Sequence, residues 1–264
     1  MRTLKIVLLG LFLAGCGVTP QAVSPTQTKE PIQVASPTII PSPTSTPDLK
    51  GTQIAEFGAT QTAQVAKVYA TRKAQSNQAT SLLDEIVRTS SEIEGLDIRD
   101  AKLVFGPENG SLTHAIDNKV TASNADVSVR NFIVHITFIN PYDTSTTGTW
   151  DYGILFRDTY ANNQYRLTVL SNQSWTLVDA STWTDIFSKN DKNLTAKAGE
   201  ENRIWLIVQE AKAFLFINGT YSQLLDVSAK VTPGDISPAT GLYYGNETAK
   251  KTTRFHDFTV WSLP

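Results

Sequence analysis

The sequence predicts an all-β antiparallel sandwich, preceded by a disordered tether and a helical segment. Three observations lead to this fold class. After residue 95, short runs alternate between apolar and polar residues, which is the period of a β-strand. About ten such runs are separated by Asn, Asp, Gly, Ser or Pro, with no helical pattern between them. Before residue 95 the chain is first rich in proline and then free of it.

Composition narrows the classes of partner and scaffold. The 264 residues have a net charge of -2, and 18% of them are charged. No basic block exists that could release counterions from nucleic acid, so we expect no nucleic-acid partner. Cys16 is the one cysteine, which excludes an intrachain disulfide. Residues 96–264 are numerous enough to bury a core without cross-links.

The N-terminus has the features of a secretion signal. Arg2 and Lys5 precede an apolar run of nine residues, IVLLGLFLA, at residues 6–14. A membrane-spanning helix needs about 20 residues, whereas this run has the length of a signal-peptide core. The motif LAGC follows at residues 13–16 and resembles the lipobox of bacterial lipoproteins.

The lipobox resemblance implies a lipid anchor. In bacterial lipoproteins the cysteine thiol receives a diacylglyceryl group, and the chain is cut just before it. Residues 1–15 would then be the signal peptide, and acylated Cys16 the mature N-terminus. Two acyl chains anchor a protein stably. We therefore expect an extracytoplasmic protein, lipid-anchored to a bacterial membrane at the cell surface. The alternative is an ordinary signal peptide with a cysteine at its end.

The next segments are predicted to be a tether and a stalk. Residues 16–50 are rich in Pro, Ser and Thr, and proline prevents both helix and sheet. Fully extended at ~3.1 Å per residue, this linker would reach on the order of 100 Å. Residues 51–95 permit a helix, with a loose apolar stripe that includes Val65 and Val68 and a stronger one in SLLDEIV at residues 81–87.

The stalk has two interpretations. The motif ATQTAQ at residue 59 recurs as ATRKAQ at residue 70, and an eleven-residue repeat favours a right-handed supercoil. Self-association through the helical stalk is therefore one hypothesis. The other is a single solvated helix whose LLDEIV end docks on the following domain.

The strands follow in order from residue 132. FIVHITF, at residues 132–138, has four apolar residues on one face and predicts a half-buried strand. WDYGILFR, at residues 150–157, alternates in the same way. RIWLIV, at residues 203–208, is apolar on both faces, which is typical of a central strand. Asn218-Gly219 lies between two apolar runs and predicts a hairpin.

These strands resemble a known class of domain. NRIWLIVQEAKAFLFINGTY, at residues 202–221, resembles the strand-hairpin-strand core of concanavalin A-like lectin/glucanase domains, the laminin-G-like jelly rolls. WDYGILFRD and TRFHDFTVW are similar to other strands of these domains. The resemblance covers about residues 112–263 and implies a jelly-roll sandwich, which we place at residues 96–264. This architecture hosts lectins, hydrolases and inert spacers.

The sequence contains no recognisable catalytic motif. Glycoside hydrolysis uses two carboxyl groups about 5–9.5 Å apart. In the strand best suited to hold them, Asp151 and Asp158 are seven positions apart, so they point to opposite faces. No metal-ligand spacing or serine-nucleophile motif occurs. We expect no cofactor, with calcium held by residues 190–193 and Asp257 as the alternative.

Binding is therefore the function we predict. Sugars are held by aromatic faces and by hydrogen bonds from polar side chains. The segment DASTWTDIFSKND, at residues 179–191, lacks a clean strand pattern, so its tryptophan is expected near the surface. GLYYGNE, at residues 241–247, should present two tyrosines on opposite faces of a strand end. The candidate ligand-binding residues are Trp183, Tyr243, Tyr244, Trp150, Tyr152 and Arg157.

The prediction is thus a surface-anchored, non-catalytic recognition module that binds carbohydrate of the envelope or the environment. One alternative is a glycan-active hydrolase of the same fold. The other is a purely structural surface lipoprotein.

Overall fold

The fold is described from a computed structural model. It describes residues 49–90, 93, 96, 98–114, 119–159, 163–246 and 248–264, with side chains in the first helix from residue 60 onward except residue 62. The chain divides into two compact units, residues 1–52 and 53–264. The predicted signal peptide, Cys16 and nearly all of the tether lie outside the described residues. The second unit holds the sandwich.

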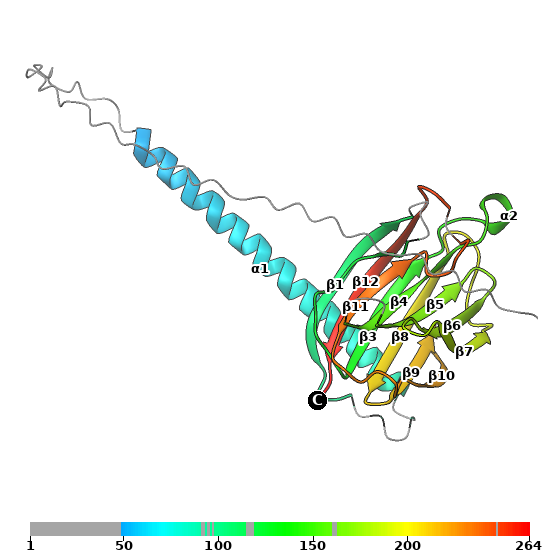
Figure 1. Ribbon diagram of the computed structural model, residues 1–264. Helices are drawn as coiled ribbons and strands as arrows, with labels where there is room; N and C mark the ends of the chain where they lie inside the picture. Colours follow the sequence, from blue (N-terminus) through cyan, green and yellow to red (C-terminus); the bar gives the residue numbers. More distant parts are fainter. Residues whose placement is uncertain are drawn as a thin grey trace, which may run out of the picture. The chain divides into compact units, whose positions relative to one another are not determined.

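Among the described residues, twelve strands form two antiparallel sheets of six strands each. Figure 1 shows these sheets with most of their strands labelled. Sheet A has the order β1 (Lys102–Thr113), β12 (Thr252–Ser262), β3 (Phe132–Ile139), β8 (Glu201–Gln209), β9 (Lys212–Ile217) and β10 (Thr220–Asp226). Sheet B has the order β2 (Thr121–Ala122), β11 (Asp235–Thr240), β4 (Asp151–Asp158), β5 (Tyr165–Leu170), β6 (Ser174–Asp179) and β7 (Thr184–Asn190). The predicted antiparallel jelly-roll sandwich, preceded by a helical segment, is confirmed.

Aromatic residues from both sheets make up much of the core between them. Phe132 of β3 meets Phe156 of β4 edge-on, with ring centroids 6.0 Å apart. Phe138 of β3 stacks on Tyr152 of β4 at 4.4 Å. Because alternate residues of a strand point to opposite faces, these pairs place residues 132, 138, 152 and 156 on the inner faces. The alternation in the sequence therefore identified the core-facing set.

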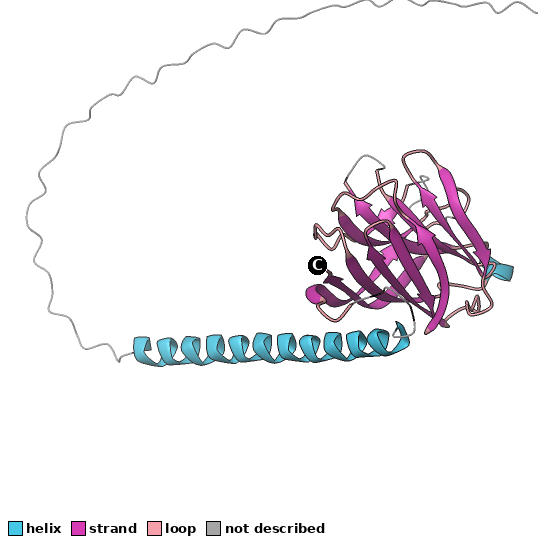
Figure 2. Cartoon of the chain, turned by 90° about the horizontal axis from the view of Figure 1, so that it is seen from below, coloured by secondary structure: helices cyan, strands magenta, loops and turns pink. Residues whose placement is uncertain are grey.

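The outer face of sheet A is apolar as well, and a helix covers it. The later part of helix α1 (Leu49–Ser90) lies against this face (Figure 2). There it buries Ala79 and Ile86. The sheet residues beneath it are Ile133, Trp205, Ile207, Phe214, Phe216 and Trp261. This contact is the arrangement described in the second interpretation of the stalk, in which the LLDEIV end of a single helix docks on the following domain. Neither described helix has an apolar stretch long enough to cross a membrane.

The helix corrects one expectation about β3. We predicted that residues 132–138 would be half-buried, yet all seven are buried. The outward set includes His135, whose ring lies 4.2 Å from that of Trp205. For β8 the expectation of a central strand with two apolar faces is correct, since Trp205 lies under the helix and Leu206 in the inter-sheet core.

The residues at two of the turns suit the backbone conformations found there. Asn218 and Gly219 join β9 to β10 with φ angles of 50° and 79°, as a two-residue hairpin loop of this composition requires. A short helix, α2 (Thr144–Thr147), has Asp143 as its N-cap, and the Asp143 carboxylate accepts the Ser145 amide at 2.8 Å. An N-cap of this kind satisfies an amide that the helix leaves unpaired.

Candidate functional site

The outer face of sheet B carries a pocket that includes three of the predicted aromatic residues. Its volume is about 270 Å³. Strand β5 contributes Arg166 and Thr168, which alternate with residues of the core and therefore point outward. The full lining is Arg166, Thr168, Val178, Trp183, Asp185, Leu242, Tyr243 and Tyr244.

Trp183 is placed by the turn between β6 and β7. Its φ of 54° lies in the left-handed region that turns use. The side chain is 62% exposed, as predicted from the irregular pattern of residues 179–191. The guanidinium carbon of Arg166 lies 4.6 Å from the centroid of the indole ring. This cation–π contact holds the ring against the strand face while leaving most of the residue's surface to solvent.

The two tyrosines lie in the loop that follows β11. We predicted a strand end with the tyrosines on opposite faces, but β11 ends at Thr240 and residues 241–246 form a loop. Tyr243 and Tyr244 therefore line the same pocket. Tyr244 is 84% exposed and Tyr243 is 36% exposed. Gly241 has a φ of 71°, which turns the backbone out of the sheet.

The loop is held by a buried carboxylate. Asp151 Oδ1 accepts the amide of Leu242, and Oδ2 accepts the amide of Tyr243, both at 2.9 Å. Burial raises the pKa of Asp151 to about 6, although these amide hydrogen bonds act in the opposite direction. The residue that the sequence offered as half of a catalytic pair thus has both oxygens engaged inside the protein.

Trp150 and Tyr152 lie elsewhere. Both are fully buried, and their rings stack on each other at 5.1 Å. The Trp150 indole donates to the Tyr142 carbonyl at 3.1 Å. The Tyr152 hydroxyl donates to Asn140 and accepts from Asn202, both at 2.7 Å. Neither ring has surface to offer a ligand, and we leave both out of the proposed site.

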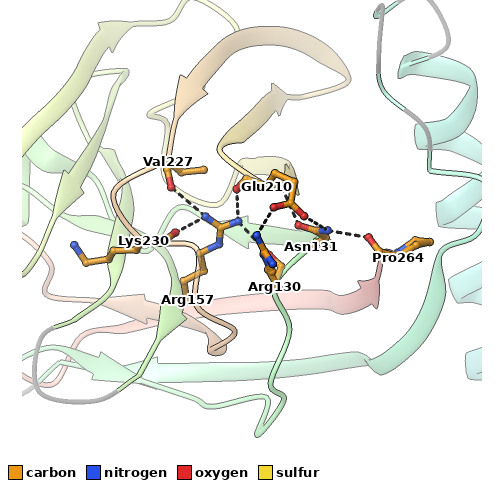
Figure 3. Close-up of polar contacts among 7 residues, drawn as sticks. All are labelled: Arg130, Asn131, Arg157, Glu210, Val227, Lys230 and Pro264. Carbon is orange, nitrogen blue, oxygen red and sulfur yellow. Dashed lines mark hydrogen bonds and ion pairs between the residues drawn. The ribbon is translucent and has the colours of Figure 1, made fainter.

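Arg157 is also buried, at a join between the two sheets (Figure 3). Its guanidinium donates to the Val227 carbonyl at 3.1 Å and to the Arg130 carbonyl at 3.2 Å. It also donates to the carbonyls of Lys230 and Glu210. Arg130 precedes β3 of sheet A, whereas Arg157 belongs to β4 of sheet B. This side chain therefore fastens the two sheets together and does not line the pocket.

Sequence reasoning did not find Arg166 or Asp185. Arg166 alternates with apolar neighbours, which marks it as outward-facing. Nothing in the local sequence shows that it contacts Trp183. The contact depends on the β5–β6–β7 meander, which brings residues 166, 183 and 185 together.

No metal site is apparent in the part of the chain that the structure describes, where no three His, Cys, Asp or Glu side chains gather closely enough to hold an ion. Asp191 follows β7 and accepts the amide of Asn193 at 3.0 Å and the hydroxyl of Ser222. Asp257 lies in β12 and contacts His256 at 2.9 Å. The two carboxylates that we considered for calcium thus belong to different sheets. The expectation of no cofactor stays a prediction, with calcium as its alternative.

Comparisons with known proteins show similarity of fold. No protein-family model matches the chain, and no curated protein is similar in sequence. One similar structure is the carbohydrate-binding module CBM66 from Bacillus subtilis, at 11% identity and a TM-score of 0.45, covering 62% of this chain and 92% of the module. Another is a protein of unknown function with a galectin-like fold from Bacillus subtilis, at 13% identity and a TM-score of 0.43, covering 63% and 92%.

A fructosyltransferase from A. japonicus is similar over a smaller share of its length. The identity is 13% and the TM-score 0.44, with 62% of this chain and 26% of the enzyme covered. At these identities and scores the likeness carries no argument about function.

Proposed function

We propose that this protein is a surface-anchored, non-catalytic module that binds carbohydrate in the pocket on the outer face of sheet B. One observation carries the proposal: Trp183, Tyr243 and Tyr244 come from two separate loops and gather around one pocket, with Arg166 and Asp185 beside them. Aromatic rings pack on the C–H faces of sugars. The guanidinium and carboxylate supply a donor and an acceptor for hydroxyl groups.

We propose a non-catalytic function because the pocket lacks a suitable pair of carboxyl groups. Glycoside hydrolysis normally pairs two carboxyl groups about 5–9.5 Å apart across the bond. Of the described residues that line the pocket, Asp185 alone bears a carboxylate. Asp151 faces the same side of sheet B, but backbone amides occupy both of its oxygens. A shallow, partly apolar site of this kind suits weak, reversible binding.

The anchor forms the second part of the proposal. The LAGC motif supports acylation of Cys16, and the proline-rich tether supports display of the domain away from the membrane. Such a linker is extended because proline favours the polyproline conformation. The sandwich would then sample glycans at a distance from the bilayer.

A glycan array tests the binding function. The full chain carrying Cys16→Ser, which cannot be acylated, is applied to an array of neutral and acidic glycans, and affinities of the hits are measured by calorimetry. Trp183→Ala and Tyr244→Ala should each weaken binding at least several-fold, because each removes an exposed ring of the pocket.

Tyr221→Ala is the matched control. Tyr221 is another exposed tyrosine, at 45%, but it lies on β10 of sheet A, whereas the pocket lies on sheet B. Its loss should leave the affinity unchanged. Equal binding by all three variants, or no glycan bound at all, would contradict the proposal. Release of reducing sugar from a bound glycan, abolished by Asp185→Asn, would instead support the hydrolase.

A further inference from the structure

We propose that Asp151 is a proton-sensitive latch on the loop that carries Tyr243 and Tyr244, so that carbohydrate binding weakens as the surroundings become acidic. The inference rests on the proposed function for its ligand. The latch itself is a property of the fold and can be measured without a ligand.

The latch consists of the Asp151 carboxylate, which lies beneath the loop of residues 241–246. Asp151 begins β4, and its side chain points away from the inter-sheet core that Tyr152 faces. Its two oxygens accept the consecutive amides of Leu242 and Tyr243. The Leu242 side chain packs against Leu155 and Ala239 on the same face. The segment that presents both tyrosines is therefore attached by this carboxylate and by the apolar contact of Leu242, and at its end by the Thr149 hydroxyl, which donates to Asn246 Oδ1 at 2.6 Å.

Only the ionised carboxylate suits this arrangement. A carboxylate accepts at both oxygens, whereas the neutral acid carries one O–H, which is a donor. After Asp151 takes a proton from solvent, that O–H faces an amide that is also a donor. One amide then loses its acceptor, and a buried unpaired amide is costly. The loop must loosen to satisfy it, which displaces the two rings that it carries.

Protonation of Asp151 falls in an accessible range. Burial raises the pKa of this carboxyl to about 6, so its charge changes between about pH 7 and pH 5. By comparison, burial acts to raise the pKa of Asp179, but hydrogen bonds from Lys230 and Ser181 lower it below its usual value. Hydrogen bonds from Ser228 likewise lower the pKa of Asp226. They stay ionised throughout this range.

Titratable groups of neighbouring segments lie near Asp151. Thr240 donates its hydroxyl to the Asp151 carbonyl at 2.8 Å, and His114 Nε2 lies 2.6 Å from the same hydroxyl. Tyr142 interacts with Asp151 through space, and burial raises the pKa of its hydroxyl above the usual value. Lys251 lies over the Tyr142 ring, with its Nζ 5.7 Å from the centroid. Of these groups, His114 is linked to Asp151 by hydrogen bonds, through the Thr240 hydroxyl.

Linkage sets the size of the effect. The amide hydrogen bonds of Leu242 and Tyr243 lower the pKa of Asp151 against the rise that burial causes. A loosened loop that lacks these bonds while the carboxyl stays buried therefore has the higher pKa, and acid favours it. A ligand that requires the latched loop then favours ionised Asp151, and ionised Asp151 favours the ligand by the same factor. One proton changes affinity by at most about tenfold per pH unit below the pKa. We expect affinity to fall about three- to tenfold between pH 7.5 and pH 5.

The test measures the loop and the ligand separately. With the full chain carrying Cys16→Ser, exchange of the Leu242 and Tyr243 amides is followed by NMR from pH 5 to pH 7.5 without ligand. Affinity for the array glycan with the strongest signal is measured over the same range. With Asp151 in place, the amides of Leu242 and Tyr243 should be protected from exchange and the glycan should bind tightly at pH 7.5. At pH 5 both the protection and the affinity should be lower. Asp151→Asn has one acceptor oxygen, so it should bind weakly with a flat pH profile.

His114→Gln is the control for the other titrating neighbour. It does not titrate but still offers a polar partner to Thr240, so the pH profile should persist. A flat profile with Asp151 intact, or loss of the profile in His114→Gln, overturns the latch. If Asp151→Asn does not fold, the amide exchange of the protein with Asp151 intact and the pH profile of His114→Gln test the latch instead. If no glycan binds at any pH, the proposed function fails. The latch is then judged by the amides alone. Amide protection that disappears below pH 6 supports it, and protection that does not change with pH overturns it.

Discussion

At the residue scale, two tryptophans show how position decides what a side chain does. Trp183 lies in the β6–β7 turn and is largely exposed. Trp205 is 1% exposed and stacks on Trp261 with ring centroids 5.8 Å apart. The same indole is therefore exposed to solvent in one place and fills a packed interface in the other.

Truncating the two tryptophans should separate these roles. We expect Trp205→Ala to lower the free energy of unfolding by ~3–5 kcal/mol, because it opens a large cavity under the helix. Trp183→Ala should change it by less than about 0.5 kcal/mol, as for most surface positions. Urea denaturation measures both. Unfolding of the domain by Trp183→Ala would show that Trp183 is structural and would remove the best residue of the proposed site.

His135 predicts a pH dependence of stability. It lies under the helix, and burial lowers its pKa from 6.5 to about 4. The unfolded chain therefore takes up a proton first as the pH falls, so the folded state loses stability between about pH 6.5 and pH 4. The loss reaches about 3 kcal/mol at most. Asp151 and His256, whose pKa values are raised, act in the opposite direction.

A variant isolates the His135 contribution from the other two. His135→Phe keeps a ring against Trp205 but does not titrate. Denaturation curves at pH 7.5 and pH 4.5 should show a smaller loss of stability at low pH in the variant than in the parent. Equal losses in the two proteins would contradict the assignment.

At the scale of elements, one face of α1 has two environments. Val65, Val68 and Tyr69 precede Leu83, Ile86 and Val87 by eighteen residues each, which is about five turns, so the two sets share a face. The later set packs on sheet A, whereas the earlier set is exposed. Self-association through the exposed set stays a prediction.

Matched substitutions on this face should measure the docking. Ile86→Ala removes a side chain that is 1% exposed and should cost about 2–5 kcal/mol. Val68→Ala, at a half-exposed position on the same face, should cost less than about 0.5 kcal/mol. Chemical denaturation followed by circular dichroism gives both values. Equal, small effects would mean that the helix does not stabilise the sandwich.

The domain boundary depends on the same interface. The sequence predicts that a chain starting at Leu96 folds alone, and this stays a prediction. The structure leads us to a different expectation, because removal of α1 would expose Trp205, Phe216 and Trp261 on the outer face of sheet A. Such a chain should bind a hydrophobic dye and aggregate. A cooperative, dye-free β-type protein starting at residue 96 would support the original boundary.

At the scale of the whole molecule, the predicted lipid anchor at Cys16 can be tested directly. Replacing Cys16 with Ser should abolish incorporation of labelled lipid and release the protein from the membrane fraction. A single cysteine makes the result easy to interpret, since no other thiol is available. A wild-type chain that takes up no lipid, together with a variant that stays membrane-bound, would contradict the lipoprotein prediction.

Much of the fold could be predicted because its signals are local. Strand periodicity depends on neighbouring residues, and the Asn218-Gly219 loop on the φ angles those residues tolerate. The site was harder to predict. Trp183, Tyr243 and Tyr244 were named on local grounds, but Trp150, Tyr152 and Arg157 were named on the same grounds and are buried. An alternating strand shows which residues share a face, and not which element covers that face.

The sequence by itself determined the antiparallel sandwich, its central apolar strand and the helix before it, since each follows from a repeat of two or 3.6 residues. Only the tertiary structure decided that α1 covers sheet A while the outer face of sheet B stays open around Trp183. It also decided that Asp151 reaches the amides of residues 242 and 243. These contacts join segments distant in the chain, and a carboxylate shows its partner only when folding brings the two together.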